Sequence, residues 1–444
     1  MKVKMLSRNL EDALRETKKD IHKVPRNYKQ SLHPFEVTRE YTRVLNAVKL
    51  ERVFAKPFLG SFDEHRDGIS CLSKHPQHLS TAYSGSCDGE IRIWNIGERK
   101  CLKSLTAHVG FVRGICFNTK SETMLSCGDD KVIKQWSLAD LFENQADDPA
   151  VTIIGKTLYT GMDHHRKQDV FSTCGQQIDV WDEEKVEPVR TYKDNNTSVS
   201  IKFNQSETNY LLSTLTDRSV ALFDIRHPFV IRKVVMKMNS NAAVWNPLKP
   251  LFFTAANEDY NLYTFDMRKM NVPVVIHKDH ISAVMDLDFS PTGEEFVSGS
   301  YDKTIRIFPS KGGHSRDVYH TKRMQRVSCV KWSLDSRFIY SASDDMVIRV
   351  WKANASEKLG VLKPREKEAF CYSQALKNKF AQHPQVKRIA RHRHVPRHVY
   401  TAAQEHRIIH DSLKRKETNK RLHSKPGTVP FISEKNKKIV SEIQ

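Results

Sequence analysis

The sequence lacks the segments that carry a chain into or across a membrane. Its longest apolar runs are only a handful of residues, as in Val272–Ile276, whereas a membrane-spanning helix needs about 20. The first twenty residues, MKVKMLSRNLEDALRETKKD, contain no apolar core of a signal peptide. We therefore expect a protein that has no membrane partner and is not secreted.

Motifs for metal, redox and nucleotide chemistry are also missing. The eight cysteines include no CxxC pair, which argues against a zinc ribbon or a thioredoxin-type site. No GxGxxG or GxxxxGK(S/T) loop is present to bind a nucleotide phosphate. Most cysteines lie in strand-like stretches, where buried thiols suit a reducing compartment such as the cytosol or nucleus. We therefore predict no metal, no cofactor and no enzyme activity.

Negative charge is scarce, and the deficit is confined to the two ends of the chain. There are 72 Lys+Arg against 52 Asp+Glu, a net charge of +20. Residues 1–60 carry +7 and residues 353–444 carry +13, whereas residues 61–352 hold 37 charges of each sign. Two basic arms on a neutral body indicate contact with a polyanion. For any single cluster, solvated disorder or a nuclear import signal is the alternative.

A repeat of about 43 residues fills the middle of the chain. An aromatic residue closes a similar strand in each copy, at intervals of 42, 45, 42, 42, 43 and 43 residues. An aspartate stands six residues earlier in every copy but the third, which has Gly175. The chain between them alternates, as in DKTIRIF (302–308), which is typical of a half-buried strand after a hairpin turn. The seven aromatic residues are Trp94, Trp136, Trp181, Phe223, Phe265, Phe308 and Trp351.

Each copy contains four predicted strands. The third strand ends at the aromatic residue, and the fourth strand follows it. Four strands per unit of this length indicate a blade of a WD-repeat β-propeller. We therefore predict an all-β fold: a seven-bladed WD-repeat β-propeller over 56–352, with a basic N-terminal extension (1–55) and a basic, α-helical C-terminal extension (353–444). The segment Lys56–Phe62 should close the ring by adding the outer strand to the blade that ends at Trp351.

A histidine, a serine, an aspartate and an aromatic residue recur at fixed spacing inside several blades. This spacing predicts a hydrogen-bonded tetrad that joins strand to loop. Its recurrence at the blade period favours that structural role over a hydrolase triad. The sixth repeat has His280, Ser298 and Asp302, with Phe308 in place of tryptophan. The two full tetrads are His65, Ser84, Asp88 and Trp94 in the first repeat, and His108, Ser126, Asp130 and Trp136 in the second.

Both flanks of the propeller resemble one family. The stretch VPRNYKQSLHPFEVTREYTRVLNAVKLERVFAKPFLGSFDEHRDGI (24–69) is similar to the start of SOF-type (suppressor of fibrillarin) WD-repeat proteins, called DDB- and cullin-associated factor thirteen in animals. KANASEKLGVLKPREKEAF (352–370), KRIARHRHVPRHVY (387–400) and HSKPGTVP (423–430) resemble the C-terminal domain of that family. The resemblance covers essentially the whole chain. It implies a non-catalytic scaffold of the nucleolar small-subunit processome, with pre-ribosomal RNA, box C/D small nucleolar RNP and processome proteins as partners.

The C-terminal extension holds two clusters of cations that we predict to contact RNA. Arginine forks bridge phosphates and stack on exposed bases. Three interleaved histidines, His392, His394 and His398, are expected to support such contacts rather than bind a metal, since the arginines would repel a cation. Helices are predicted from Pro364 to before Pro384 and from about Pro396 into the 420s. The predicted RNA-binding residues are Lys387, Arg388, Arg391, Arg393, Arg397, Lys414, Arg415 and Lys416.

Two adjacent repeats end in the pattern aromatic-Asp-x-Arg. This ending resembles the box by which some WD-repeat proteins dock on the DDB adaptor of cullin-four ubiquitin ligases. It implies a second function, that of a substrate receptor of such a ligase. For each arginine, the alternative is a salt bridge to its own aspartate. The predicted adaptor-binding residues are Phe223, Asp224 and Arg226, and Phe265, Asp266 and Arg268.

Overall fold

The computed structural model describes residues 35–144, 148–193 and 196–443, and these form two compact units. The helical unit comprises the described residues up to 54 together with 358–391. The propeller unit comprises 55–357 and the chain from residue 392 onward. The predicted basic N-terminal extension is therefore described only from residue 35, and the predicted C-terminal extension is shared by the two units. No helix among the described residues is long and apolar enough to cross a membrane.

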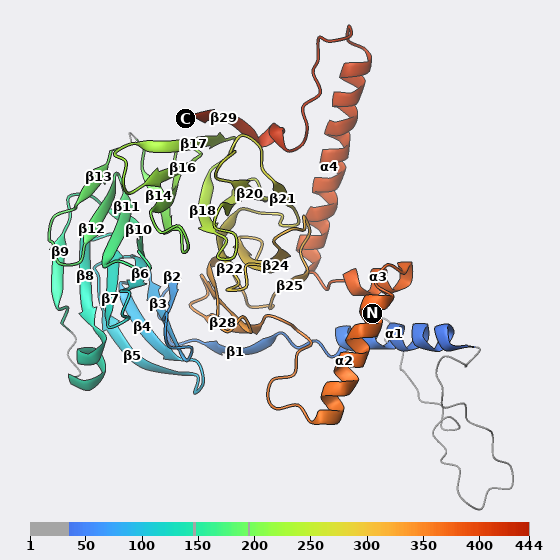
Figure 1. Ribbon diagram of the computed structural model, residues 1–444, viewed down its shortest axis with the longest axis horizontal. Coiled ribbons are helices and arrows are strands. Elements are labelled where there is room, and N and C mark those ends of the chain that lie inside the picture. Colours follow the sequence, from blue (N-terminus) through green and yellow to red (C-terminus); the bar gives the residue numbers. More distant parts are fainter. Residues whose placement is uncertain (1–34, 145–147, 194–195, 444) are drawn as a thin grey trace, which may run out of the picture. The chain divides into compact units, whose positions relative to one another are not determined.

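The strands of the propeller unit form seven antiparallel sheets around a ring (Figure 1). Within the described ranges, six of these sheets have four strands, and one has five. The predicted WD-repeat β-propeller is thus confirmed, and its seven sheets agree with the seven aromatic repeats. The aromatic residue of each repeat is buried in a blade because alternate side chains of a strand point to the same face.

The strands follow the chain around the ring. The first three sheets contain β2 (Ile69–Lys74), β3 (Thr81–Ser86), β4 (Glu90–Asn95) and β5 (Lys100–Thr106); β6 (Val112–Phe117), β7 (Thr123–Gly128), β8 (Val132–Ser137) and β9 (Val151–Ile154); and β10 (Tyr159–His164), β11 (Val170–Gly175), β12 (Ile178–Asp182) and β13 (Arg190–Tyr192). A π-helical turn, η3 (Asp140–Asn144), follows β8.

The remaining four sheets include the two that contain a strand from outside the repeats. They contain β14 (Ser198–Phe203), β15 (Tyr210–Leu215), β16 (Ser219–Asp224), β17 (Val230–Met236) and β29 (Ile439–Ile443); β18 (Ser240–Trp245), β19 (Phe252–Asn257), β20 (Leu262–Asp266) and β21 (Val275–His277); β22 (Val284–Phe289), β23 (Glu295–Ser300), β24 (Ile305–Pro309) and β25 (Asp317–Tyr319); and β26 (Val327–Trp332), β27 (Phe338–Ser343), β28 (Ile348–Lys352) and β1 (Phe58–Phe62).

The ring closes in the predicted way. Strand β1 pairs antiparallel with β28, with Phe58 opposite Trp351 and Phe62 opposite Ile348. On the inner side of the ring, the Ser328 hydroxyl of the last blade donates to the Ile69 carbonyl of the first, at 2.6 Å. The first and last blades are therefore joined through an outer strand and through their inner strands. This arrangement covers the strand edge that β28 would otherwise expose.

The tetrad of the second blade forms a continuous chain of hydrogen bonds. Trp136 donates its Nε1–H to Ser126 Oγ at 3.0 Å, and Ser126 Oγ lies 2.9 Å from His108 Nε2. His108 Nδ1 lies 2.9 Å from an Asp130 carboxylate oxygen. Burial lowers the pKa of His108, so a neutral ring donates from Nδ1 to Asp130 and accepts from Ser126 at Nε2. Each donor among these four side chains, Trp136, Ser126 and His108, then has an acceptor.

The first blade departs from this pattern at its aspartate. His65 Nε2 lies 2.6 Å from Ser84 Oγ, which also accepts from Trp94 Nε1 at 2.7 Å. Asp88 instead accepts from the Ser86 hydroxyl, and the buried His65 Nδ1 has no hydrogen-bond partner among the residues that the structure describes. The predicted four-residue tetrad is therefore incomplete here. In this blade the hydroxyl of Ser86, two residues before the aspartate, takes the place of the histidine at the carboxylate.

The third blade has Gly175 where other repeats have aspartate because the space there is already filled. A Cβ atom at position 175 would lie 2.1 Å from the Leu158 carbonyl oxygen. Trp181 still donates its Nε1–H to a strand hydroxyl, that of Thr173, at 2.8 Å. This blade thus keeps the inner half of the tetrad and relies on packing for the rest.

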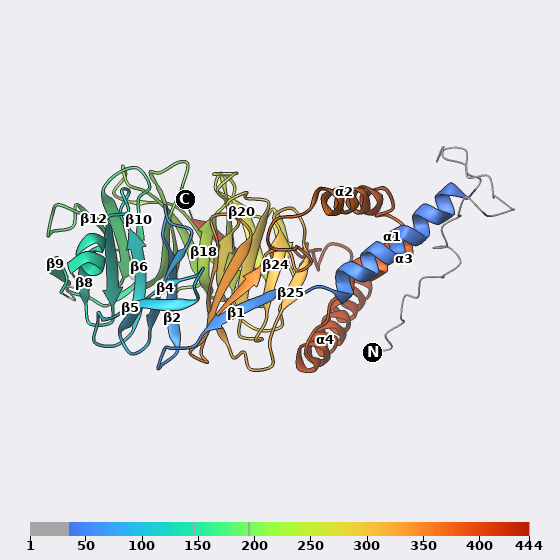
Figure 2. The ribbon, with the colours of Figure 1, turned by 90° about the horizontal axis from the view of Figure 1, so that it is seen from below.

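After the helical unit, the chain returns to the propeller as a helix, a short turn and a strand. Helix α4 (Arg397–Leu422) lies beside the blade that contains β25 (Figures 1 and 2). The chain then passes through the 3-10 turn η4 (Asn436–Lys438) and ends as β29, which pairs antiparallel with the outer strand β17. The sequence predicts α4 but not this fifth strand.

The helical unit combines segments from the two ends of the chain. It consists of α1 (Glu36–Val53), α2 (Pro364–Lys379) and α3 (Pro384–Arg391). Its core contains Val44 and Val48 of α1, Leu376 of α2 and Val386 of α3. Proline begins both α2 and α3, since the first turn of a helix tolerates a missing N–H.

Candidate nucleic-acid and adaptor interfaces

Three of the predicted RNA-binding residues lie on helix α3 of the helical unit. Val386 is buried and Ile389 is partly buried in the core of the unit. Arg388 and Arg391 are exposed and Lys387 is half-buried. Among the described residues, no carboxylate forms an ion pair with these three cations. An amphipathic helix of this kind holds its cations toward solvent, where they can meet phosphate.

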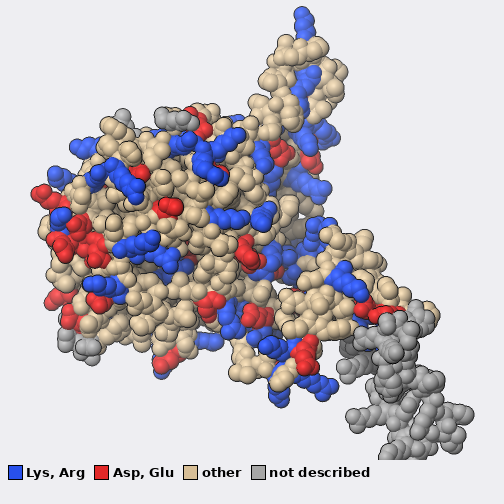
Figure 3. Space-filling model, in the orientation of Figure 1, with Lys and Arg blue, Asp and Glu red and all other residues tan. Residues whose placement is uncertain are grey.

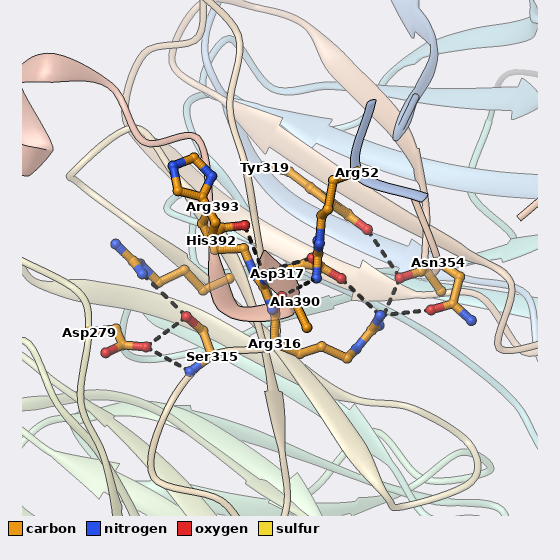
Figure 4. Close-up of polar contacts among 12 residues, drawn as sticks. Arg52, Asp279, Ser315, Arg316, Asp317, Tyr319, Asn354, Ala390, His392 and Arg393 are labelled. Carbon is orange, nitrogen blue, oxygen red and sulfur yellow. Dashed lines mark hydrogen bonds and ion pairs between the residues drawn. The ribbon is translucent and has the colours of Figure 1, made fainter. Parts of the chain in front are cut away.

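Arg393 differs from its neighbours because it contacts the propeller. Its Nε lies 3.4 Å from Asp317 Oδ1 and donates to the Arg316 carbonyl (Figure 4). Only 17% of the side chain is exposed. This position disagrees with the predicted RNA contact, since a guanidinium bound to a carboxylate has fewer donors left for phosphate. The structure gives Arg393 the task of fixing the start of the C-terminal segment to β25.

The carboxylate that Arg393 contacts belongs to a network centred on Arg316. Arg316 Nη1 donates to Asp317 at 2.9 Å and to Asn354 Oδ1 at 2.7 Å, and Nη2 donates to the Ala353 carbonyl at 2.8 Å (Figure 4). Burial alone would lower the pKa of Arg316, but Glu295 and Asp317 raise it above its ordinary value. A permanently charged arginine therefore links the β25 blade to the chain after β28.

The three interleaved histidines have separate environments. His394 stacks on His320 with ring centroids 5.4 Å apart, and His398 Nε2 lies 3.4 Å from the Asp302 carbonyl. His392 is exposed. Across the described residues, no group of three His, Cys, Asp or Glu side chains is arranged to hold a metal ion.

The second cation cluster lies on helix α4. Arg397, Lys414, Arg415 and Lys416 are exposed, and Figure 3 shows Lys and Arg gathered along the projecting helix, whereas the propeller face mixes both signs. The helix is held at several points. Val399 is buried, the His406 ring packs on Tyr260 at 5.1 Å, and Glu417 pairs with Lys437 at 2.5 Å. Its exposed face therefore presents cations on a fixed support.

The first predicted adaptor box, in the blade of β16 and β17, presents its arginine to solvent. Phe223, predicted as an adaptor contact, is fully buried in this chain, so the exposed part of the box is its arginine. Asp224 accepts a hydrogen bond from the Arg226 backbone N–H at 2.9 Å. Within the described residues, no ion pair or hydrogen bond involves the exposed Arg226 side chain. Phe229, 78% exposed, lies three residues away.

The second box, in the next blade, uses its arginine internally. Arg268 Nη2 pairs with Asp266 at 2.8 Å, and its Nε lies 3.1 Å from the same carboxylate. This hydrogen-bonded pair holds the pKa of Asp266 below its ordinary value. Phe265, like Phe223, is fully buried. The salt bridge that the sequence left as an alternative therefore forms at Arg268, whose side chain remains 63% exposed.

Three features of these surfaces have no counterpart in the sequence analysis. They are the packing of α1 on α2 and α3, the pairing of Arg393 with Asp317, and the added strand β29. The first had a visible signal. Tyr41, Val44, Leu45 and Val48 follow the spacing of one face of a helix, although the sequence does not say what that face covers.

Family models match both parts of the chain. Segments 56–95, 99–137, 271–308 and 313–352 match the WD domain, G-beta repeat, and residues 353–439 match the Sof1-like domain. Among solved structures, the WD40 β-propeller domain of Doa1 superposes with a TM-score of 0.57. It covers 67% of this chain and 96% of that chain at 19% identity, so it supports the fold alone.

Full-length relatives are much more similar. DDB1- and CUL4-associated factor 13 of Homo sapiens is 56% identical over 445 residues, and that of Xenopus laevis is 55% identical, each match covering 100% of both chains. Protein SOF1 of Saccharomyces cerevisiae is 43% identical over 469 residues, covering 100% of this chain and 95% of the yeast protein. The chain therefore belongs to the family of WD-repeat proteins with a Sof1-like domain that includes Protein SOF1 and DDB1- and CUL4-associated factor 13.

Proposed function

We propose that this protein is a non-catalytic scaffold of the nucleolar small-subunit processome, which supports pre-rRNA processing and assembly of the small ribosomal subunit. The observation that carries the proposal is the division of charge. The propeller region 61–352 is neutral, whereas 353–444 has a net charge of +13 and presents exposed cations on α3 and α4. The similarity to Protein SOF1 over the whole chain supports the same assignment.

In this scaffold the blades and the basic helices α3 and α4 have different tasks. The neutral propeller engages assembly proteins, since a ring of blades offers broad faces without a catalytic constellation. The helical extensions neutralise phosphates of pre-ribosomal RNA and of the box C/D small nucleolar RNP. The exposed or half-buried cations for this task are Lys387, Arg388, Arg391, Arg397, Lys414, Arg415 and Lys416.

Gradient sedimentation tests the scaffold. Tagged full-length protein in nuclear extract should co-sediment with large particles that contain the precursor of small-subunit rRNA, and RNase should shift it toward the top of the gradient. A variant with Lys387, Arg388, Arg391 and Arg397 changed to Gln should sediment in lighter fractions without RNase. Protein that stays small in both conditions would overturn the proposal.

The second candidate function is that of a substrate receptor of a cullin-four–DDB ubiquitin ligase. Two observations favour it: the names of the animal relatives and the exposed Arg226 beside Phe229. Because Arg268 already binds Asp266, Arg226 is the better dock. Arg226→Ala should abolish recovery of the adaptor in a pull-down, whereas the matched change Arg268→Ala should retain most of it. Equal recovery with both variants would remove Arg226 as the dock.

A further inference from the structure

Helix α3 is too short to present its cations alone. It spans eight residues, Pro384–Arg391, whereas isolated helices shorter than about 12–15 residues are marginal in water. Its inward side chains therefore need a partner surface. Val386 is 3% exposed in the core of the helical unit, and Ile389 and Ala390 pack against that core. The positions of the cations on the outer side of α3 therefore depend on the element that covers its apolar side.

Helix α1 completes it and contacts α3 near both of its ends. The Tyr41 hydroxyl donates to Gln385 Oε1 at 2.5 Å, next to the start of α3. Arg52 Nη2 donates to the Ala390 carbonyl at 2.6 Å, one of the last carbonyls of α3, which have no partner within the helix. Between them, the fully buried Val44 and the nearly buried Val48 supply the apolar surface.

The helical unit has an excess of positive charge that its own glutamates do not neutralise. Residues 35–54 and 358–391 together hold 13 Lys and Arg against 5 Glu, a net charge of +8. Most of the glutamates are used within the unit: Glu40 pairs with Lys379 at 2.6 Å, Glu51 with Lys377 at 2.8 Å and Glu366 with Lys358 at 3.1 Å. The cations of α3 take no part in these ion pairs.

We propose that α1 is a structural part of the RNA-binding surface, so that the N-terminal helix holds α3 in place and binding of the RNA phosphate backbone needs both ends of the chain. This inference rests on the proposed function. Val48 and Glu51 act here as positioning residues, because they touch α3 or α2 and not the RNA. The physical reason is that three cations on a melted segment lose the fixed spacing that matches successive phosphates.

The test uses the full-length protein and a fluorescein-labelled single-stranded RNA. Val48→Asp should lower the slope of log affinity against log salt by about 2, as the loss of three phosphate contacts does at about 0.7 each. Changing Lys387, Arg388 and Arg391 to Gln should lower it equally, and the combined variant should add nothing. Asn46→Asp, an exposed change of identical charge on the same helix, should leave the slope unchanged.

A charge reversal keeps the test valid if Val48→Asp unfolds the protein. Glu51→Lys should weaken RNA binding although it adds positive charge, and the double variant with Lys377→Glu, which restores the pair, should recover it. Stronger binding by Glu51→Lys would overturn the inference in favour of simple net-charge attraction. Wild-type binding by Val48→Asp, with weak binding by the α3 variant, would overturn it while sparing the proposed function. Wild-type binding by the α3 variant would overturn the inference and would remove α3 from the proposed RNA contacts, whereas the proposed function would then rest on α4.

Discussion

The cations between residues 387 and 397 should not contribute equally to RNA binding. The perturbation is a set of single changes to Gln at Lys387, Arg388, Arg391, Arg393 and Arg397. Four of these side chains form no ion pair within the described part of the chain, whereas the Arg393 guanidinium contacts Asp317 and the Arg316 carbonyl. A cation that already has a carboxylate releases fewer counterions when RNA binds.

The size of the difference follows from counterion release. Each phosphate contact on a single strand contributes about 0.7 to the slope of log affinity against log salt, so four free cations contribute about 2.8 and all five would contribute about 3.5. Arg388→Gln should thus lower the slope by about 0.7, whereas Arg393→Gln should leave it unchanged. The Arg393 change should instead loosen the segment that precedes α4, with faster amide exchange at its first turn.

Fluorescence anisotropy with labelled single-stranded RNA at several salt concentrations measures these slopes. Each variant needs an unfolding midpoint as its folding control. A slope that falls by the same amount for Arg393→Gln as for Arg388→Gln would refute the reasoning, since it would mean that the Asp317 contact leaves Arg393 free for phosphate.

Three further predictions concern the propeller. Asp130→Ala leaves the buried Nδ1–H of His108 without its acceptor, so it should lower the free energy of unfolding, measured with denaturant, by about 1–3 kcal/mol. Asp88→Ala should lower it by less, because Asp88 does not bond its histidine. Equal losses of stability would contradict the assigned hydrogen bonds. Burial lowers the pKa of His277 to about 4, against about 6.5 in the unfolded chain. Because protonation favours the unfolded state, the stability that the neutral His277 contributes is present above pH 6.5 and is lost toward pH 4. The thermal midpoint of wild type should therefore fall more steeply over that window than that of His277→Gln, and parallel curves would contradict this prediction. Deletion of residues 439–444 should speed amide exchange in β17, which loses its pairing with β29. Exchange in β15 should not change, because β15 stays paired with β14 and β16. Unchanged β17 exchange would mean that β29 is not bound in solution.

The propeller could be predicted from the sequence because its signals are local and repeated. Alternation after each aspartate fixes which side chains face the blade core, and seven copies agree in spacing. The ring closure between Phe58–Phe62 and the strand ending at Trp351 followed from the need to cover open sheet edges. The blade in which Asp88 turns to Ser86 was not foreseen, because the competing serine belongs to the same turn and leaves the spacing intact.

The candidate sites were less predictable because they depend on contacts between distant segments. Two boxes of equal appearance differ in the structure: Arg268 folds back on Asp266, whereas Arg226 points to solvent. Nothing in the spacing separates these rotamers. In the sequence, Arg393 looks like one more cation in a basic run. Its ion pair with Asp317, 76 residues earlier, is visible only in the structure.

The basic helices, and not the neutral ring, should carry the RNA contacts. Ultraviolet crosslinking of the full-length protein in nuclear particles, with the crosslinked peptides and nucleotides both mapped, tests it most directly. Crosslinks to pre-ribosomal RNA should be concentrated in residues 387–391 and 397–421, and Val48→Asp should remove those of the α3 peptide. Crosslinks that fall only on the blades, or a helical extension found crosslinked only to acidic protein segments, would contradict it.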